Sequence, residues 1–165
     1  MSEIHYKTGD ATRPATGGRN IIAHICNDIG GWGKGFVMAL SRRWPEPEKA
    51  YRKWYSEKSP PFELGAVQAI EVAHNLLVAN MIAQHGIRGN SEGPPIRYAA
   101  LRSCLEALSE DARRLDASVH MPRIGCGLAG GTWEKVEPMI VATLLADRVP
   151  VHVYDFEAPA SDKAI

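Results

Sequence analysis

Residues 122–136 read PRIGCGLAGGTWEKV, and this stretch decides the fold. Four of the seven residues from 125 to 131 are glycine. Glycine is costly to order, so such a cluster indicates a backbone that approaches a ligand closely or adopts positive φ. The preceding residues 117–121, ASVHM, are typical of a buried strand, and residues 132–147 predict a helix with Thr132 as its N-cap. A strand, a glycine loop and a helix N-terminus in this order commonly hold a phosphate.

A second stretch repeats this design. Residues 26–40, CNDIGGWGKGFVMAL, place glycines at positions 30, 31, 33 and 35 between a predicted strand and a predicted helix. Ligands of α/β sheets bind beyond the carboxyl ends of the strands, so two such loops can hold one diphosphate with backbone N–H groups. Neither loop contains the P-loop pattern or a dinucleotide fingerprint in its usual place after the first strand. Tight turns without a ligand are the alternative interpretation.

The remaining apolar patterning predicts an α/β fold. Strands are expected at 4–8, 20–26, 65–72, 75–83, 117–121 and 149–156, and helices at about 33–43, 46–55, 94–115 and 132–147. Alternating strands and helices favour a three-layer α/β/α sandwich with a mixed central sheet of about six strands. Only two residues separate 65–72 from 75–83, so this pair is expected to be antiparallel. We expect one domain over 1–156 and a flexible C-terminal tail at 157–165.

Composition excludes several function classes. The 165 residues carry 19 basic and 19 acidic side chains, which gives no support for nucleic-acid binding through bulk charge. The three cysteines, at 26, 104 and 126, form neither a disulfide framework nor a CxxC zinc pattern, and no metal site or cofactor is expected. The first ten residues lack an apolar signal region, and no apolar run is long enough to span a membrane. A cytoplasmic location is therefore expected.

Several motifs together resemble a known family. YKTGDATRP, NIIAHICNDIGGWGKG, NMIAQHGIRGN and ASVHMPRIGCGLAGGTWEKV, followed by VHVYDF, occur in the order found in macrodomains, and the resemblance runs from residue 5 to residue 156. The macrodomain is an ADP-ribose-binding module, so the resemblance implies ADP-ribose and mono-ADP-ribosylated proteins as partners. The chain looks most like the branch that contains the macrodomain of a chromatin remodeller amplified in liver cancer. The terminal ADP-ribose protein glycohydrolase and the yeast ADP-ribose-1″-phosphate phosphatase are near relatives of that branch.

The resemblance implies two residue groups around adenine. The carboxylate of Asp10 would accept a hydrogen bond from the adenine amino group, while the backbone of Ala11 would meet a ring nitrogen. Tyr154 and Phe156 end the last predicted strand, where an aromatic side chain of this family stacks on adenine. The alternatives are a turn-forming role for Asp10 and a core position for one of the two aromatic residues.

The resemblance also assigns the two glycine loops. The first loop would surround the distal ribose and the diphosphate through Asn27, Trp32, Gly33, Lys34 and Gly35. The second would bind the diphosphate through Gly125, Cys126, Gly127, Leu128, Ala129 and Gly130. Trp32 is equally suited to be a lid or a core anchor, and Lys34 a phosphate contact or a solvated side chain. Cys126 has no evident paired base, so it is interpreted as a small residue in a crowded loop rather than a nucleophile.

The catalytic groups of the glycohydrolase relative are absent. Gln84 and Ala129 stand where that enzyme has a nucleophilic Lys and an Asp, and an amide cannot form a Schiff base with the ribose. We therefore expect hydrolysis of mono-ADP-ribosyl esters on Glu or Asp by a positioned water, with His24, Asn27, Gln84 and His85 as the candidate residues and the ligand phosphate as the proton acceptor. His24 on an apolar strand can instead be a core histidine. The alternatives are an ADP-ribose reader, an ADP-ribose-1″-phosphate phosphatase, and an α/β interaction module that holds another nucleotide or none.

Overall fold

A six-stranded sheet in the order β1-β6-β5-β2-β4-β3 forms the centre of the computed structural model, which describes residues 3–91 and 93–156. The strands are β1 (His5–Thr8), β2 (Arg19–Asn27), β3 (Val67–Ala73), β4 (Leu76–Gln84), β5 (Ala117–Pro122) and β6 (Val151–Asp155). The helices are α1 (Phe36–Ser41), α2 (Glu46–Glu57), α3 (Tyr98–Leu115), α4 (Trp133–Ile140) and the π-helical turn η1 (Val141–Leu145). The tail expected at 157–165 lies outside the described residues.

Strand direction places several loops at one edge of the sheet. All neighbouring strands are parallel except β3 and β4, which form the expected antiparallel hairpin. The prediction of a mixed sheet is therefore confirmed. The carboxyl ends of β6, β5, β2 and β4 consequently lie in a row, in that order, along the same edge.

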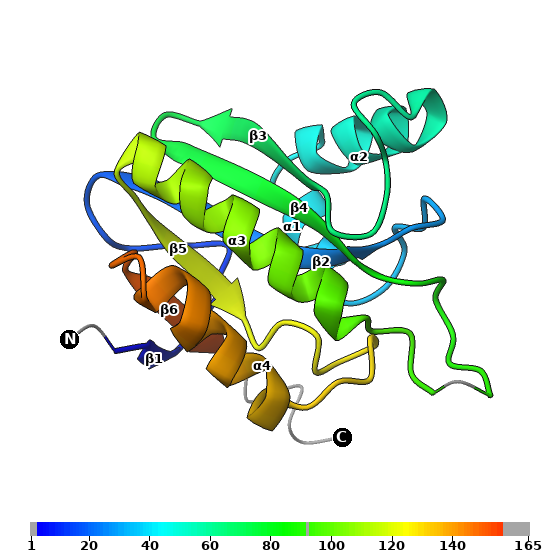
Figure 1. The fold of residues 1–165 in the computed structure, drawn as a ribbon. Coiled ribbons are helices and arrows are strands. Elements are labelled where there is room, and N and C mark those ends of the chain that lie inside the picture. Colours follow the sequence, from blue (N-terminus) through cyan, green and yellow to red (C-terminus); the bar gives the residue numbers. More distant parts are fainter. Residues whose placement is uncertain (1–2, 92, 157–165) are drawn as a thin grey trace, which may run out of the picture.

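Alternation along β2 explains the layers on either side of the sheet (Figure 1). Ile21 and Ala23 join the larger core, which includes the apolar faces of α3, α4 and η1. Ile22 and Cys26 point to the opposite side and join the smaller core with Leu40 of α1 and Tyr51 of α2. A strand that is apolar on both faces needs cover on both, which is why this sequence forms a three-layer sandwich. The predicted fold class is confirmed.

Three predicted helices begin or end elsewhere for local reasons. The helix expected from residue 33 starts only after Gly35, whose φ of 82° is not helical. The helix expected from residue 94 starts at Tyr98, because Ile96 and Arg97 donate their N–H groups to the Ala129 and Ala83 carbonyls and Arg97 has an extended backbone. The helix expected at 132–147 divides into α4 and η1, where the Thr143 hydroxyl donates back to the Met139 carbonyl at 2.7 Å.

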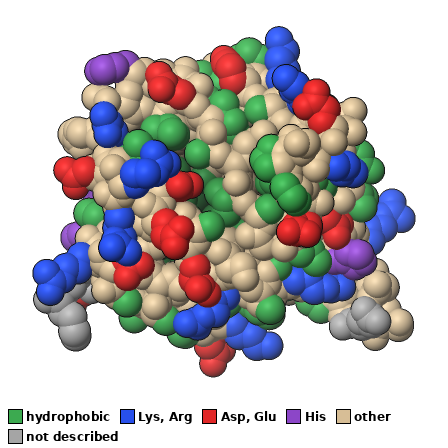
Figure 2. All heavy atoms as spheres, turned by 45° about the horizontal axis from the view of Figure 1, so that its top comes forward, with side chains coloured by type: hydrophobic (Ala, Val, Ile, Leu, Met, Phe, Trp, Pro, Cys, Tyr) green, Lys and Arg blue, Asp and Glu red, His purple; other side chains and the backbone are tan. Residues whose placement is uncertain are grey.

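The surface carries both signs of charge. On the face shown in Figure 2, basic and acidic side chains are interspersed around apolar patches. Within residues 3–91 and 93–156, no helix combines the length and apolarity that crossing a bilayer requires. The same residues contain no cluster of three or more His, Cys, Asp or Glu side chains that could hold a metal ion.

Candidate functional site

The predicted ligand loops follow strands that are neighbours in the sheet. β6 leads to Phe156, β5 to the loop 123–132, β2 to the loop 28–35, and β4 to His85. The loops 28–35 and 123–132 approach one another, since a Cβ added to Gly35 would lie 3.2 Å from the Leu128 side chain. Three strand spacings separate β6 from β4, a distance of roughly 14 Å. The row therefore forms one elongated site at the carboxyl edge of the sheet.

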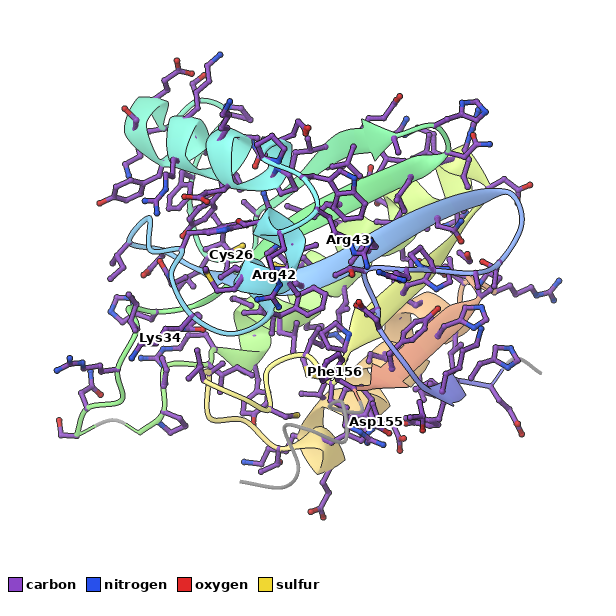
Figure 3. All side chains as sticks on the ribbon, turned by 180° about the vertical axis from the view of Figure 1, so that it is seen from behind. Cys26, Lys34, Arg42, Arg43, Asp155 and Phe156 are labelled. Carbon is purple, nitrogen blue, oxygen red and sulfur yellow. The ribbon has the colours of Figure 1, made fainter. Side chains whose placement is uncertain are left out.

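A pocket of about 600 Å³ lies at the β6 end of this row. Its walls come from the segment 9–13, from α1 and the residues after it, and from the ends of β5 and β6. Figure 3 shows Arg42, Arg43 and Phe156 on the face where this pocket lies. The pocket contains five of the predicted ligand residues, namely Asp10, Ala11, Gly35, Tyr154 and Phe156.

Asp10 is held by its own turn. The backbone N–H and the hydroxyl of Thr12 donate to Asp10 Oδ1 at 2.9 and 2.7 Å, and Arg43 Nη2 lies 3.5 Å from Oδ2. Arg43 Nε also donates to the Thr12 hydroxyl at 2.7 Å. Burial raises the pKa of Asp10, but the Thr12 hydrogen bonds and the Arg43 charge outweigh it, and the pKa lies below its ordinary value. The carboxylate is thus fixed and ionised, with its Oδ2 facing the Arg43 guanidinium.

The aromatic pair at the end of β6 divides into a fixed and an exposed member. Tyr154 is 6% exposed, and its hydroxyl forms a 2.8 Å hydrogen bond with His120 Nδ1. His120 Nε2 lies 2.8 Å from Asn20 Oδ1, which only accepts, so His120 donates there and accepts the Tyr154 hydroxyl. Phe156 is 72% exposed at the pocket rim. Tyr154 therefore provides a rigid wall, and Phe156 provides the free aromatic face.

The second glycine loop is tightly folded at its ends and open in its middle. A Cβ added to Gly125 would lie 2.6 Å from the Ile96 side chain, and one added to Gly131 would lie 2.6 Å from the Gly125 carbonyl oxygen. Gly127, by contrast, has no atom within 4 Å of an added Cβ. Among the described residues, the N–H groups of 127–129 donate to no backbone acceptor. These three amides are therefore available to an anion.

Other members of this loop have structural contacts. Ala129 is 5% exposed, and its carbonyl accepts from Ile96 N at 3.0 Å. Gly130 has a φ of 78° and donates from its N–H to the Gly127 carbonyl. The Cys126 thiol contacts the Ile124 carbonyl at 3.4 Å, and burial raises its pKa although Arg123 lowers it. A protonated thiol suits the small-residue interpretation of Cys126.

Asn27 organises the first glycine loop. Its Oδ1 accepts from the N–H groups of Ile29 and Gly31 at 3.0 and 2.9 Å, and its Nδ2 donates to the Gly31 carbonyl at 2.9 Å. The Tyr51 hydroxyl, from α2, donates to the Asn27 backbone carbonyl and lies 2.9 Å from Oδ1. The side chain of Asn27 therefore holds the loop in shape, while Gly33 and Lys34 at its far end are exposed.

Two predicted site residues lie in the core instead of the cleft. Trp32 is 6% exposed and donates from its indole N–H to the Ser41 hydroxyl, which matches the core-anchor alternative. His24 is 2% exposed, and its Nε2 lies 2.5 Å from Asn80 Oδ1. The His24 and Trp32 rings make an edge-to-face contact with a centroid distance of 5.5 Å. Burial lowers the pKa of His24 to about 4, although the Asn80 hydrogen bond raises it. These contacts match the core-histidine alternative for His24.

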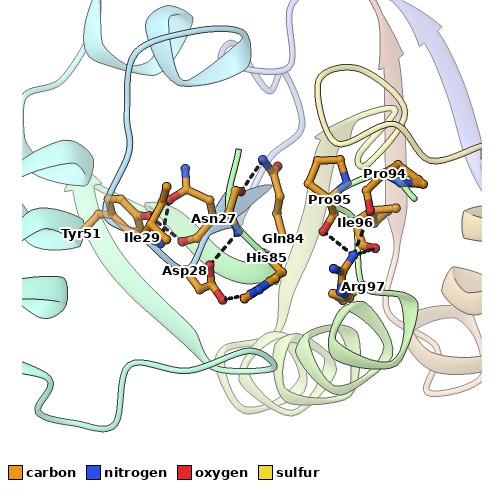
Figure 4. Close-up of polar contacts among 11 residues, drawn as sticks. Asn27, Asp28, Ile29, Tyr51, Gln84, His85, Pro94, Pro95, Ile96 and Arg97 are labelled. Carbon is orange, nitrogen blue, oxygen red and sulfur yellow. Dashed lines mark hydrogen bonds and ion pairs between the residues drawn. The ribbon is translucent and has the colours of Figure 1, made fainter. Parts of the chain in front are cut away.

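An imidazole–carboxylate pair stands at the β4 end of the row (Figure 4). His85 Nδ1 lies 2.7 Å from Asp28 Oδ2, and the Gly86 N–H donates to Asp28 Oδ1 at 2.8 Å. The His85 side chain is 56% exposed, whereas that of Asp28 is 17% exposed. Because the carboxylate only accepts, His85 donates from Nδ1 to Asp28 Oδ2. Neighbouring Gln84 is 9% exposed and donates to the Gly86 carbonyl.

Sequence reasoning missed Asp28, Arg42 and Arg43. Asp28 directly follows the end of β2, and this position could have indicated that its carboxylate lies at the ligand edge of the sheet. Arg43 contacts Asp10 only because the fold brings α1 against the segment 9–13, and no local pattern reports that contact. The spacing of Phe36 and Ala39 places them on one face of α1, and Arg43, two residues beyond its end, lines the same pocket.

Comparisons with known proteins agree with this architecture. The family described as Macro domain matches residues 23–140. A macrodomain protein of Streptomyces coelicolor is 52% identical, with a TM-score of 0.84 over 93% of this chain and 99% of that chain. The mouse Chromodomain-helicase-DNA-binding protein 1-like is 33% identical over 164 residues, which cover 94% of this chain but 18% of the mouse protein.

An enzyme is also among the relatives. The ADP-ribose 1″-phosphate phosphatase of Chaetomium globosum is 26% identical over 157 residues, covering 86% of this chain and 84% of that protein. The Macro domain match includes β2 from Ala23 onward, both glycine loops and all of α4. By its sheet, its loops and these similarities, the chain belongs to the Macro domain family.

Proposed function

We propose that this protein binds ADP-ribose along the carboxyl edge of its sheet and hydrolyses the ester that joins mono-ADP-ribose to Glu or Asp side chains of proteins. The supporting observation is the pair of glycine loops that meet at Gly35 and Leu128. A pocket with a fixed carboxylate lies at one end of these loops, and an exposed imidazole lies at the other. This order matches a ligand with a nucleobase, a diphosphate and a second ribose.

Each part of the ligand has complementary groups along the row. Adenine occupies the pocket, where Asp10 Oδ2 accepts its amino N–H and the Phe156 ring covers its face. The diphosphate receives the unpaired amides of 127–129, which supply hydrogen bonds without adding a charge that must be desolvated. The distal ribose then reaches the end of β4, next to His85.

Asp10→Ala is expected to weaken ADP-ribose binding by about 10- to 100-fold, because a hydrogen bond to a charged group contributes about 1.5–3 kcal/mol. Isothermal titration calorimetry measures this against a wild-type Kd expected in the micromolar range, about −8 kcal/mol. Wild-type protein that gives no heat at millimolar ADP-ribose would refute the binding proposal.

Thr12→Val separates ligand contact from turn formation. This variant removes the hydroxyl that bonds Asp10 Oδ1 and Arg43 but keeps the Asp10 carboxylate. If Asp10 contacts adenine, Thr12→Val weakens binding less than Asp10→Ala does. Equal losses in the two variants would assign Asp10 a role in the turn alone.

Hydrolysis requires only a water and a proton acceptor. The water oxygen forms a bond to C1″ of the distal ribose, the bond between C1″ and the ester oxygen breaks, and the protein carboxylate leaves. In this proposal His85 Nε2 accepts the water proton, while Asp28, hydrogen-bonded to Nδ1, holds the ring and stabilises the resulting imidazolium. Gln84 offers no amine, so no covalent protein–sugar intermediate forms at that position.

His85→Ala is expected to lower the rate of ADP-ribose release by about 100-fold, the lower range of general-base contributions. The substrate is a transferase automodified on carboxylates, and released ADP-ribose is quantified over time. Asp28→Asn should lower the rate less, because it keeps the imidazole but removes the charge that orients it. His74→Ala, at an exposed site in the turn between β3 and β4, is the matched control.

Other outcomes of the same assay identify the alternatives. Binding without any release would make the protein a reader of ADP-ribose. Phosphate release from ADP-ribose 1″-phosphate, without release from modified carboxylates, would identify a phosphatase like the Chaetomium relative. Borohydride added during turnover should leave the protein mass unchanged, and a sugar adduct would refute the water mechanism.

A further inference from the structure

Three exposed apolar side chains gather on the first glycine loop at the β4 end of the site. Ile29 belongs to the loop itself and is 48% exposed. Tyr55 of α2 is 37% exposed, and a Cβ added to Gly30 would lie 2.5 Å from its ring. Ile87, which follows β4, is 48% exposed, and a Cβ added to Gly31 would lie 2.8 Å from its Cδ1. Side chains from three segments thus meet at three consecutive residues, and they are called the Ile29–Tyr55–Ile87 patch below.

The patch borders the imidazole–carboxylate pair. Ile29 directly follows Asp28, and Ile87 lies two residues after His85. Figure 4 shows Ile29 next to Asp28, with His85 on the other side of that carboxylate. Successive Cα atoms are about 3.8 Å apart, so the Cα atoms of both isoleucines lie within roughly 8 Å of a Cα atom of the pair.

The packing of the fold explains these side chains only in part. Glycine at positions 30 and 31 lets Tyr55 and Ile87 touch the loop, and these contacts support its shape. None of the three side chains of the patch, however, belongs to either apolar core. Single exposed apolar side chains are ordinary on a protein surface, but a group of them beside a ligand site is typical of an interaction surface.

The chemistry of the proposed substrate brings a polypeptide to this end of the site. The distal ribose reaches the end of β4, and its C1″ carries the ester to a Glu or Asp side chain. That side chain is only about 4–5 Å long, so the backbone of the modified protein passes close to His85 on its outer side. Successive residues of an extended chain advance by about 3.3–3.6 Å, and the neighbours of the modified residue therefore reach Ile29 and Ile87.

We propose that the Ile29–Tyr55–Ile87 patch binds the polypeptide that carries the ADP-ribosyl group and selects segments with large apolar residues one or two positions from the modified Glu or Asp. This inference rests on the proposed function, because it uses the position of the distal ribose assigned there. Apolar neighbours of the modified residue are buried against the patch, whereas free ADP-ribose ends at the ribose and leaves the patch exposed. The modified protein thus gains affinity from its own sequence as well as from its nucleotide.

Three ligands compared by calorimetry test this inference without any need for hydrolysis. The first is ADP-ribose. The other two carry ADP-ribose joined at C1″, through a hydrolysis-resistant amide, to the central side chain of a short peptide. One peptide has leucine at the two positions on each side of the modified residue, and the other has serine there.

The leucine peptide is expected to bind about tenfold more tightly than the serine peptide, as burial of one leucine-sized side chain provides. The ratio should persist as salt rises, because an apolar contact is not screened. If ADP-ribose binds and the two peptides bind equally, this inference is overturned while ADP-ribose binding stands. If ADP-ribose itself does not bind, the proposed function fails and this inference fails with it.

Two variants identify the side chains responsible. Ile29→Ser and Ile87→Ser should each reduce the affinity ratio between the leucine and serine peptides toward one and leave the Kd of ADP-ribose as in the wild type. Val141→Ser is the matched control, because Val141 on η1 is also 48% exposed, and it should keep the wild-type ratio. A wild-type ratio in both isoleucine variants would overturn the assignment. Equal weakening of all three ligands in both variants would make the patch a support of the loop and overturn it as well.

Discussion

Gly127→Glu is expected to abolish ADP-ribose binding while leaving the fold intact. A Cβ at this position meets no atom within 4 Å, and the backbone there is outside the left-handed region, so a longer side chain is accommodated without strain. Its carboxylate would stand among the unpaired amides of 127–129 and repel the diphosphate. Because exclusion and charge repulsion act together, we expect a loss of more than about 100-fold.

Two further variants make this result specific. Gly127→Gln has nearly the same size but no charge, and it should retain part of the affinity that Gly127→Glu loses. Gly17→Glu introduces the same charge at an equally open glycine between β1 and β2, and it should bind as wild type does. Calorimetry measures binding and circular dichroism measures folding. Wild-type affinity in folded Gly127→Glu would place the diphosphate elsewhere.

Acidification from pH 7 to pH 4 is expected to destabilise the protein through its buried histidines. Burial lowers the pKa of His24 to about 4 and is the main cause that lowers that of His120 to about 3. An unfolded histidine has a pKa of about 6.5, so between these values the unfolded chain binds protons that the folded chain does not. The free energy of unfolding therefore falls with the pH, by ~3 kcal/mol at pH 4 for His24 alone.

Chemical denaturation at the two pH values measures this loss. His24→Gln should reduce the loss by about 3 kcal/mol, because the group that protonates on unfolding is gone. His120→Gln provides a second measurement if the first variant does not fold. His74→Gln, exposed in the β3–β4 turn, is the control. If His24→Gln and His120→Gln both lose as much free energy of unfolding between pH 7 and pH 4 as the wild type does, the assignment to these histidines is contradicted.

The fold class could be predicted from the spacing of apolar residues, because that spacing shows which faces of each strand and helix are buried. The two apolar faces of β2 require cover on both sides, and the short gap before β4 requires a hairpin, so layers and strand direction both follow. The order of the strands does not follow, because it depends on which edge each helix crosses. The division of the final helix into α4 and η1 lies beside Thr143, whose hydroxyl donates back to the Met139 and Ile140 carbonyls, and sequence period does not report such contacts.

The sequence predicted the parts of the site that consist of backbone, which are the two glycine loops. It predicted less well the contacts that side chains make there. Glycine spacing located both loops, since only backbone approach explains such clusters. The same spacing cannot say that Asn27 turns inward onto its own loop, or that Trp32 covers His24 instead of the cleft. The Asp28–His85 pair joins residues 57 positions apart, and Arg43 meets Asp10 across 33 positions. Such pairs exist only after the strands have assembled.

The hydrogen bond from Tyr51 to Asn27 bears on how variant libraries of this protein are interpreted. Tyr51 is fully buried in α2, yet its hydroxyl supports the residue that shapes the first glycine loop. A screen scored by ligand capture would therefore rank Tyr51 beside true contact residues. Only a parallel score for protein abundance, together with the isosteric change to Phe, separates a weakened scaffold from a lost contact. Selections for altered specificity should accordingly leave this tyrosine fixed and randomise the pocket rim instead.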